Sequence, residues 1–345
     1  MANQNITHTV SELRQEFVPS RLLPATTAGV LVGLINIVYA ISFVALAYGS
    51  LPTMIPRAIG LSLAGLALLQ AIVILTSSNA GMIATPQDVP TAVLGLVTVY
   101  IISDFPAGTP PEELFITVTA AVMLSTFATG LFFLILGYFK LGNLVRFLPY
   151  PVIGGFLAGT GWLLVIGGIN VMTSLPVDLA NLPTLLSADY LLRWGIGLTF
   201  AILLFVILKR LTHYTVFPIT LVITIVTFYI VLWLIGIPTQ QMMDQNWLMG
   251  PFPENNSLQP LTLNNLAEIE WATVLRHSSS LLTILPISVI SLLLHATSLE
   301  LIIEKNLNLN HELKVAGWAN MAISSFGSMQ GFHGAVSSSL LYKIA

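Results

Sequence analysis

The sequence contains no cysteine and few charged residues. Without cysteine, the chain has no disulfide, no thiolate metal site and no catalytic thiol. Charged residues make up 8% of the chain, whereas soluble domains carry roughly 25%. Hydrophobic residues make up 55%, and the mean hydropathy is +0.88. A soluble fold cannot bury so much apolar sequence, so the composition predicts a multi-pass helical protein in a lipid bilayer.

Motifs for catalysis and nucleotide hydrolysis are also missing. The sequence has no G-x-x-x-x-G-K-[ST], no H-E-x-x-H, no G-x-S-x-G and no cluster of cysteine and histidine. The net charge of -3 indicates no nucleic-acid partner. We therefore predict that the protein is not an enzyme and does not hydrolyse ATP. We also expect no bound cofactor and no metal site.

Seven apolar segments are each near the roughly 20 residues that a membrane helix requires. They are residues 26–49, 55–75, 114–139, 152–172, 190–208, 216–237 and 281–303. Two weaker segments, 313–326 and 336–345, follow near the end. Glycines 154, 155, 159 and 161 begin one span and favour tight helix packing over ligand contact.

Residues 77–102 form a broken membrane segment, which brings the total to about ten membrane elements. The segment begins polar, has Asp88 between Pro86 and Pro90, and then stays apolar for too short a run to cross a bilayer. Irregular backbone at membrane depth occurs only where protein buries it or where it lines a wet cavity. A short helix that begins there directs its N–H groups and positive dipole end at a ligand, which suits an anion. We therefore expect the solute site here.

Basic residues fall in alternate loops, which predicts that these loops and the N-terminus are cytosolic. The residues are Lys140 with Arg146, Lys209 with Arg210, and Lys305 with Lys314. Residues 1–24 have mixed charge and are predicted to be a cytosolic lead-in to a bacterial inner or plasma membrane protein. The polar stretch 238–278 would be an external loop, in which an Asn cap and a helical period over 264–276 predict an interfacial helix.

Four motifs occur in order along the chain. Residues 148–169 read LPYPVIGGFLAGTGWLLVIGGI, with P-x-x-V-x-x-G-F-x-x-G starting at Pro149. Residues 36–42 read NIVYAIS, residues 311–320 read HELKVAGWAN, and FGS at 326–328 is followed by three serines at 337–339. Together these stretches resemble the transmembrane domain of the sulfate permease (SulP) family of inorganic anion transporters, closest to its divergent branch of fungal vacuolar and bacterial members.

The resemblance implies an all-α transporter fold of two inverted repeats, each with seven helices. Residues 25–139 and 279–345 would form a core domain, 140–237 a gate domain and 238–278 the external loop. The chain stops at Ala345, before the last four helices and the cytosolic STAS domain usual in the family, so the second repeat would be incomplete. We expect a fragment of a longer transporter, or a partner chain that supplies the rest. The family also implies a homodimer.

In this family the anion lies between the N-termini of the third and tenth half-helices, beside the first helix. The matching residues here are Val89, Pro90, Thr91 and Ala92, then Ala335, Val336, Ser337 and Ser338, and Tyr39, Ser42 and Phe43 from the first helix. The hydropathy pattern supports the same region, because the interrupted segments 77–102 and 326–345 lie at equivalent positions of the two halves. The serines would either bind the anion or cap their helix.

Three titratable residues are candidates for coupling transport to Na⁺ or H⁺. Asp88 is either functional at membrane depth or a cap of the half-helix that follows. His295 stands where many members carry an acidic residue in the eighth helix, and it is either a titrating group or a neutral core residue. Glu300 faces the site or lies at the cytosolic edge.

These observations predict transport of a small inorganic anion, sulfate first and bicarbonate next. The mechanism would be secondary-active or facilitative alternating access without covalent chemistry. Half-helix dipoles and hydroxyl groups would bind the anion, because no basic residue lies in the middle of a span. Two alternatives stay open: a non-transporting truncated membrane protein or subunit, and a purine or dicarboxylate carrier of the related inverted-repeat fold.

Overall fold

The structure is a computed structural model that describes residues 19–143, 149–211, 213, 215–245, 247–248 and 258–344. Within these ranges, seven helices are long and apolar enough to cross a membrane. They are α2 (Pro19–Tyr48), α3 (Ile55–Thr76), α5 (Pro111–Tyr138), α6 (Tyr150–Thr173), α8 (Ala188–Arg210), α9 (Val216–Ile235) and α12 (Ser278–Ile303). The seven predicted full-length spans are confirmed, and the chain is an integral multi-pass membrane protein.

The helix ends follow local sequence signals. Pro111 occupies the first position of α5, where no N–H is needed, and Glu112 and Glu113 complement the positive end of its dipole. Lys209 and Arg210 lie in the last turn of α8, where their positive charges complement the negative end of that helix dipole. The helix α2 begins at Pro19, so residues 19–24 of the predicted lead-in are already helical, and residues 1–18 lie outside the described part of the chain.

Both broken segments contain a short strand followed by a helix. After α3 the chain forms β1 (Ala84–Pro86) and α4 (Asp88–Ser103), and after α13 (Leu309–Ser324) it forms β2 (Gly331–His333) and α14 (Ala335–Ile344). The two strands pair antiparallel, with Ala84 opposite His333 and Pro86 opposite Gly331. This β1–β2 ribbon therefore fixes the starting points of α4 and α14 relative to each other.

Buried side chains complete the hydrogen bonds of the β1–β2 ribbon. Asn320 donates to the Gly331 carbonyl at 2.6 Å and accepts from the Gly331 N–H at 3.0 Å. Gln87 donates to the Phe332 carbonyl at 3.0 Å, and Asn36 donates to the Ala84 carbonyl at 3.4 Å. Asn36, Gln87 and Asn320 are all buried. Backbone at this depth has no water to bind, so these side chains make the irregular segments tolerable there.

The core is formed where α13 crosses α5 and α3. Gly130 of α5 faces Gly317 of α13 so closely that a Cβ at Gly130 would lie 2.7 Å from the Gly317 carbonyl oxygen. Small residues permit this backbone approach, as is usual between membrane helices. The tight packing expected at glycines 154, 155, 159 and 161 is wrong for the described residues, because a Cβ at any of them would meet no atom within 4 Å.

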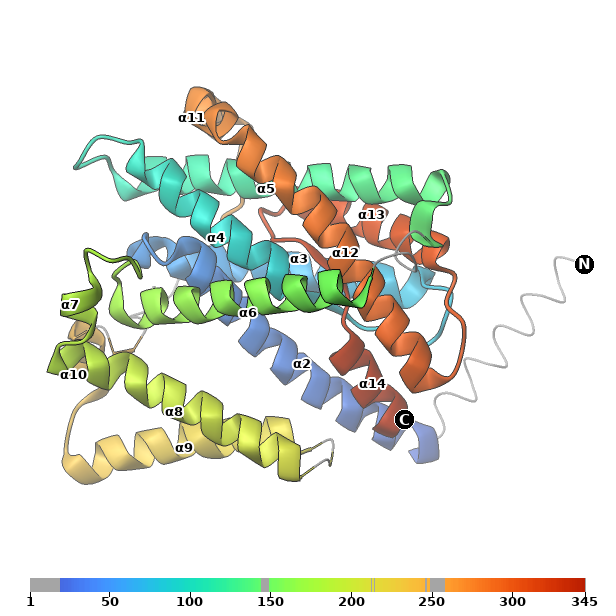
Figure 1. Cartoon of the computed structure of the whole chain (residues 1–345), viewed down its shortest axis with the longest axis horizontal. Helices are drawn as coiled ribbons and strands as arrows, with labels where there is room; N and C mark the ends of the chain where they lie inside the picture. Colours follow the sequence, from blue (N-terminus) through green and yellow to red (C-terminus); the bar gives the residue numbers. More distant parts are fainter. Residues whose placement is uncertain are drawn as a thin grey trace, which may run out of the picture.

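The helices α8 and α9 lie at one edge of the molecule, whereas α6 runs across the middle of the view (Figure 1). The helix α8 contacts both α6 and α9. The helix α8 buries none of its residues, and α9 buries only Pro218 and Leu232. The helix α6 contacts α4 and α2, which links this edge to the core. The division into core and gate domains stays a prediction.

Short helices connect the membrane helices. They are η1 (Pro52–Met54), α7 (Leu182–Leu185), α10 (Thr239–Asp244), η3 (Leu263–Ala267) and α11 (Trp271–Arg276). The single interfacial helix expected over 264–276 is wrong, because that stretch forms η3 and α11 with a break between them. Thr262 and Asn265 form a capping box that favours the short first turn.

Candidate functional site

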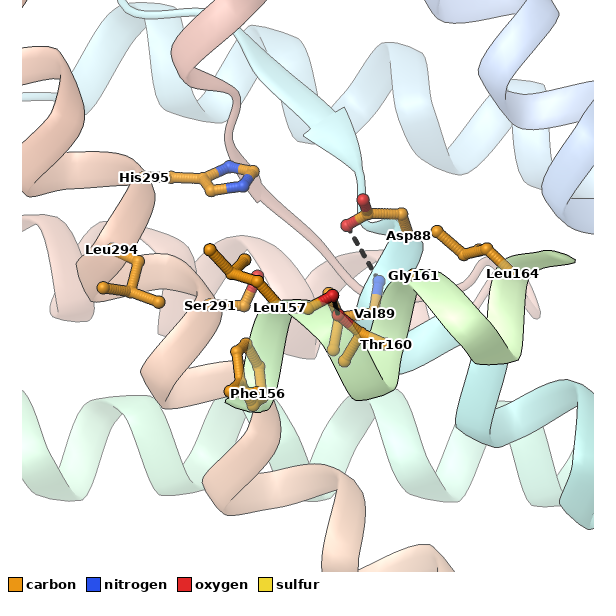
Figure 2. Close-up of a pocket in the computed structure, with 10 residues that line it drawn as sticks. All are labelled: Asp88, Val89, Phe156, Leu157, Thr160, Gly161, Leu164, Ser291, Leu294 and His295. Carbon is orange, nitrogen blue, oxygen red and sulfur yellow. Dashed lines mark hydrogen bonds between the residues drawn. The ribbon is translucent and has the colours of Figure 1, made fainter. Parts of the chain in front are cut away.

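A cavity of about 160 Å³ lies where the start of α4 meets α6 and α12 (Figure 2). Its polar lining residues are Asp88, Thr160, Ser291 and His295. Its other lining residues are Val89, Phe156, Leu157, Gly161, Leu164 and Leu294. The cavity thus combines a half-helix N-terminus, two hydroxyl groups, one imidazole and one carboxylate.

Asp88 is the first residue of α4, at the position where the broken segment becomes helical. Its Oδ1 atom accepts a hydrogen bond of 2.8 Å from the Val89 N–H, and the side chain is half-buried. A carboxylate here is stabilised by the positive end of the helix dipole. Asp88 therefore satisfies one N–H of the first turn of α4 and lines the cavity, although Gln87 holds the N-cap position. A functional role for Asp88 stays a prediction.

His295 lies on α12 and points toward Asp88 in Figure 2. Its Nδ1 atom is 3.3 Å from the backbone carbonyl oxygen of His333 in β2. A carbonyl only accepts, so Nδ1 carries the hydrogen and Nε2 is left to accept a hydrogen bond or a second proton. The ring also packs edge-on against Phe332, with 6.2 Å between centroids. The β1–β2 ribbon therefore orients this imidazole.

The other residues predicted on α4 and α14 pack inside the protein or face outward. Thr91 is buried, and its hydroxyl donates to the Gln87 carbonyl at 2.5 Å. Ser338 accepts from the Ile83 N–H at 2.9 Å, and Ser337 is also buried. Pro90 and Ala92 are buried, Ala335 is half-buried and Val336 is 65% exposed. Among the predicted residues of these two helices, Val89 and Asp88 line the cavity.

The predicted residues on α2 and Glu300 lie away from the cavity lining. Tyr39 and Phe43 stack on each other with 6.0 Å between ring centroids, and Ser42 is exposed. Glu300 accepts a hydrogen bond of 2.8 Å from the Leu307 N–H, just after α12 ends. A solute role for Tyr39, Ser42 and Phe43 stays a prediction.

Sequence reasoning missed most of the residues that line the cavity. Ser291 is four residues before His295 and therefore lies on the same face of α12. This spacing could have predicted Ser291 from the sequence. Thr160, Leu157 and Leu164 face the cavity only because α6 packs against α4, and no local pattern indicates this contact.

Comparison with known proteins agrees with this architecture. The model of the sulfate permease family matches residues 25–344. The chain belongs to the sulfate permease family. Its fold is that of the transmembrane domain of a cyanobacterial bicarbonate transporter, BicA, with a TM-score of 0.69, 20% identity, and coverage of 95% of this chain and 79% of that one. The predicted all-α transporter fold is therefore confirmed.

Two curated relatives of the sulfate permease chain differ in what they carry. This chain is 21% identical to a vacuolar basic amino acid transporter of Saccharomyces cerevisiae, and the match covers 95% of this chain and 32% of that protein. It is 38% identical over 107 residues to the bicarbonate transporter BicA of Picosynechococcus, which is 28% of this chain and 18% of that protein. The chain thus spans about a third of the length of the yeast relative.

Proposed function

We propose that this chain forms the membrane domain of an alternating-access transporter whose solute binds in the cavity between α4, α6 and α12. The position of the cavity carries this proposal. One wall comes from α4 and α12, which belong to the buried core, and the other wall comes from α6, whose glycine-rich face meets few atoms. Movement of α6 relative to α4 and α12 would open and close the cavity without any covalent step.

The solute that fits best is a small monovalent anion, with bicarbonate ahead of sulfate. The Ser291 hydroxyl offers a donor to an anion, and the His295 ring offers another when its Nε2 atom takes up a proton, while the positive end of the α4 dipole faces the same cavity. The Thr160 hydroxyl already donates to the Leu157 carbonyl and can only accept from a solute. None of the ten lining residues is Lys or Arg, whereas Asp88 is negative. Two like charges 4 Å apart repel by about 4 kcal/mol at an effective dielectric constant of 20, and a dianion meets this repulsion twice. The similarity to BicA supports the same choice.

A second candidate solute is a basic amino acid. Asp88 supports it, because a carboxylate without a basic neighbour in the cavity lining is a natural partner for a cationic group. The yeast relative, which matches 95% of the chain, is named for this solute class. The two candidates differ in what they require of Asp88: an anion tolerates its charge, whereas a cation needs it.

Uptake of labelled bicarbonate, sulfate and arginine into proteoliposomes tests both candidates. We expect the wild-type chain to take up bicarbonate, and Asp88→Asn to retain this uptake and to admit more sulfate. Asp244→Asn, at the exposed end of α10, is the matched control and should leave all three unchanged. Arginine uptake that disappears in Asp88→Asn would replace the anion proposal. No uptake of any of the three by the wild type would contradict transport by this chain.

We also infer a cytosolic N-terminus in a bacterial plasma membrane and coupling to a cation. Lys209 and Arg210 end α8 on the side that the positive-inside rule assigns to the cytosol, whereas Glu112 and Glu113 begin α5 on the other side. A homodimer stays an expectation from the family. Labelling of single cysteines introduced near Lys209 or Glu112 with an impermeant reagent tests the orientation.

A further inference from the structure

Glu312 and His333 form a buried pair outside the cavity lining. The Oε2 atom of Glu312 lies 2.7 Å from the Nε2 atom of His333, and their side chains are 0% and 1% exposed. Glu312 belongs to the first turn of α13, and His333 is the last residue of β2. The transport proposal above does not use either side chain.

Three further donors surround the Glu312 carboxylate. Ser77 donates its hydroxyl to Oε2 at 3.0 Å, and Ser78 donates its N–H to Oε1 at 2.9 Å as well as its hydroxyl. This set of donors fits an ionised carboxylate, which only accepts. A buried negative charge needs a positive partner close by, and His333 supplies one when it is protonated. The pair is therefore neutral overall when it holds one proton.

We propose that the Glu312–His333 pair is the binding site for a proton that is coupled to transport. This inference rests on the proposed transport function and adds the coupling ion and its location. The pair is close to water on one side, because Ser78 is exposed while it donates to Glu312. On the other side, the carbonyl of His333 is 3.3 Å from Nδ1 of His295, which lines the cavity.

Coupling would act through the β1–β2 ribbon, since a carbonyl accepts hydrogen bonds but transfers no proton. His333 pairs with Ala84 of β1, so its side chain contact holds the ribbon against α13 and the loop after α3. Loss of the proton would leave the buried carboxylate with its serine donors but without a positive partner, which is costly. The protein would then favour a conformation in which Glu312 meets water, and this shift would move the ribbon, His295 and the start of α4.

Other titratable groups surround the pair at longer range. His311, next to Glu312 on α13, has its Nε2 atom 2.7 Å from the Thr76 carbonyl oxygen. Tyr342 of α14 donates to the Ala80 carbonyl in the loop that carries the two serines. Asp88 lies across the cavity from His295. Each of these groups has its own partner or lies at a helix terminus. The carboxylate of Glu312, at 2.7 Å, is therefore the charged group in direct contact with His333.

Nitrogen NMR of ¹⁵N-histidine-labelled full-length chain in nanodiscs tests proton binding without any transport assay. We expect one imidazole signal that changes from singly to doubly protonated as the pH is lowered. His333→Asn should remove this signal, and Glu312→Gln should abolish the change or move it to lower pH. Glu268→Gln is the matched control, because this exposed carboxylate accepts from the side-chain amide of Asn265. A His333 signal that stays singly protonated over the whole pH range of the uptake assay would overturn the proposal, and a variant is needed only to assign the signal.

Proteoliposome uptake tests coupling. With an inward pH gradient, we expect faster uptake of the transported solute by the wild type and by Glu268→Gln. In Glu312→Gln the response of uptake to the pH gradient should disappear, while exchange of labelled for unlabelled solute continues. If Glu312 had a purely structural role, the variant would lose the gradient response and the exchange together. A wild type without a gradient response, or a Glu312→Gln variant that keeps it, would overturn coupling here. No uptake by the wild type would instead reject the transport proposal, and the NMR result would still decide whether the pair binds a proton.

Discussion

Asp104 connects the two helices that carry the titratable residues of the cavity. It follows the last residue of α4, and its Oδ2 atom lies 2.9 Å from a guanidinium nitrogen of Arg276 and 3.0 Å from Nε2 of His277. Both partners directly precede α12. The hydrogen bond from His277, with the charge of Arg276 nearby, lowers the pKa of Asp104 below its ordinary value. The far ends of α4 and α12 are thus linked through an ionised carboxylate.

The lowered pKa of Asp104 predicts a stability loss in acid. Because the folded pKa is below the unfolded value of about 3.9, the contribution is complete above that pH and disappears as the pH falls through the folded value. The Tm of the solubilised protein should therefore fall more between about pH 5 and pH 3 in the wild type than in Asp104→Asn. The effect should be small, since exposed ion pairs contribute little. Asp244→Asn is the control, and equal pH dependence in all three proteins would contradict the argument.

At the level of single residues, the sequence predicted those residues of the cavity whose charge or polarity makes them costly in a lipid bilayer. Asp88 between two prolines and His295 in an apolar span are costly at membrane depth, and both line the cavity. Ser338 shows the opposite case, because its hydroxyl is used by the backbone of Ile83. A serine near a helix start fits solute binding and backbone capping equally well, and only the tertiary structure identifies its partner. Solute contact by the predicted residues stays a prediction.

Among the elements, the membrane helices could be predicted and the β1–β2 ribbon could not. A long apolar run has few alternatives to a helix in a bilayer, because the helix satisfies its own backbone. The ribbon has three residues on each side and pairs segments from the two ends of the chain. Its stability comes from buried Asn36, Gln87 and Asn320, which are far apart in sequence. No local pattern contains that information.

The crossing of α5 and α13 predicts a sharp difference between two glycines. Gly130→Ala would place a methyl group 2.7 Å from the Gly317 carbonyl oxygen and 2.8 Å from Met321 N, so the helices must separate. Such overpacking costs about 1–3 kcal/mol. Gly154→Ala on α6 is the control, because its methyl group would meet no atom within 4 Å. Thermal unfolding in detergent should show a lower Tm for Gly130→Ala only. An equal Tm for both variants would mean that the helix crossing is looser than the structure indicates.

At the level of the whole molecule, the transport proposal requires α6 to move relative to the core. The helices α6 and α2 approach closely at Gly167, where a Cβ would lie 2.2 Å from Cδ1 of Leu46. Replacing Leu46 by cysteine removes that methyl group and leaves room for a second cysteine at Gly167. The sequence has no cysteine, so within one molecule a pair introduced here can react only with itself, and non-reducing gel electrophoresis separates this product from disulfide-linked dimers.

The double variant Leu46→Cys with Gly167→Cys should form a disulfide across this contact under oxidising conditions, because a Cβ at Gly167 would lie 3.5 Å from Cγ of Leu46, the position that the cysteine sulfur takes. Locking α6 to α2 should abolish uptake of whichever solute the wild type carries, and reduction should restore it. The matched control is Leu46→Cys alone, in which oxidation should not change the rate of uptake. Uptake by the fully cross-linked protein, measured together with the fraction of free thiol, would show that the cavity opens without movement at this contact. The moving boundary would then have to lie elsewhere, between α6 and α8 or within the core.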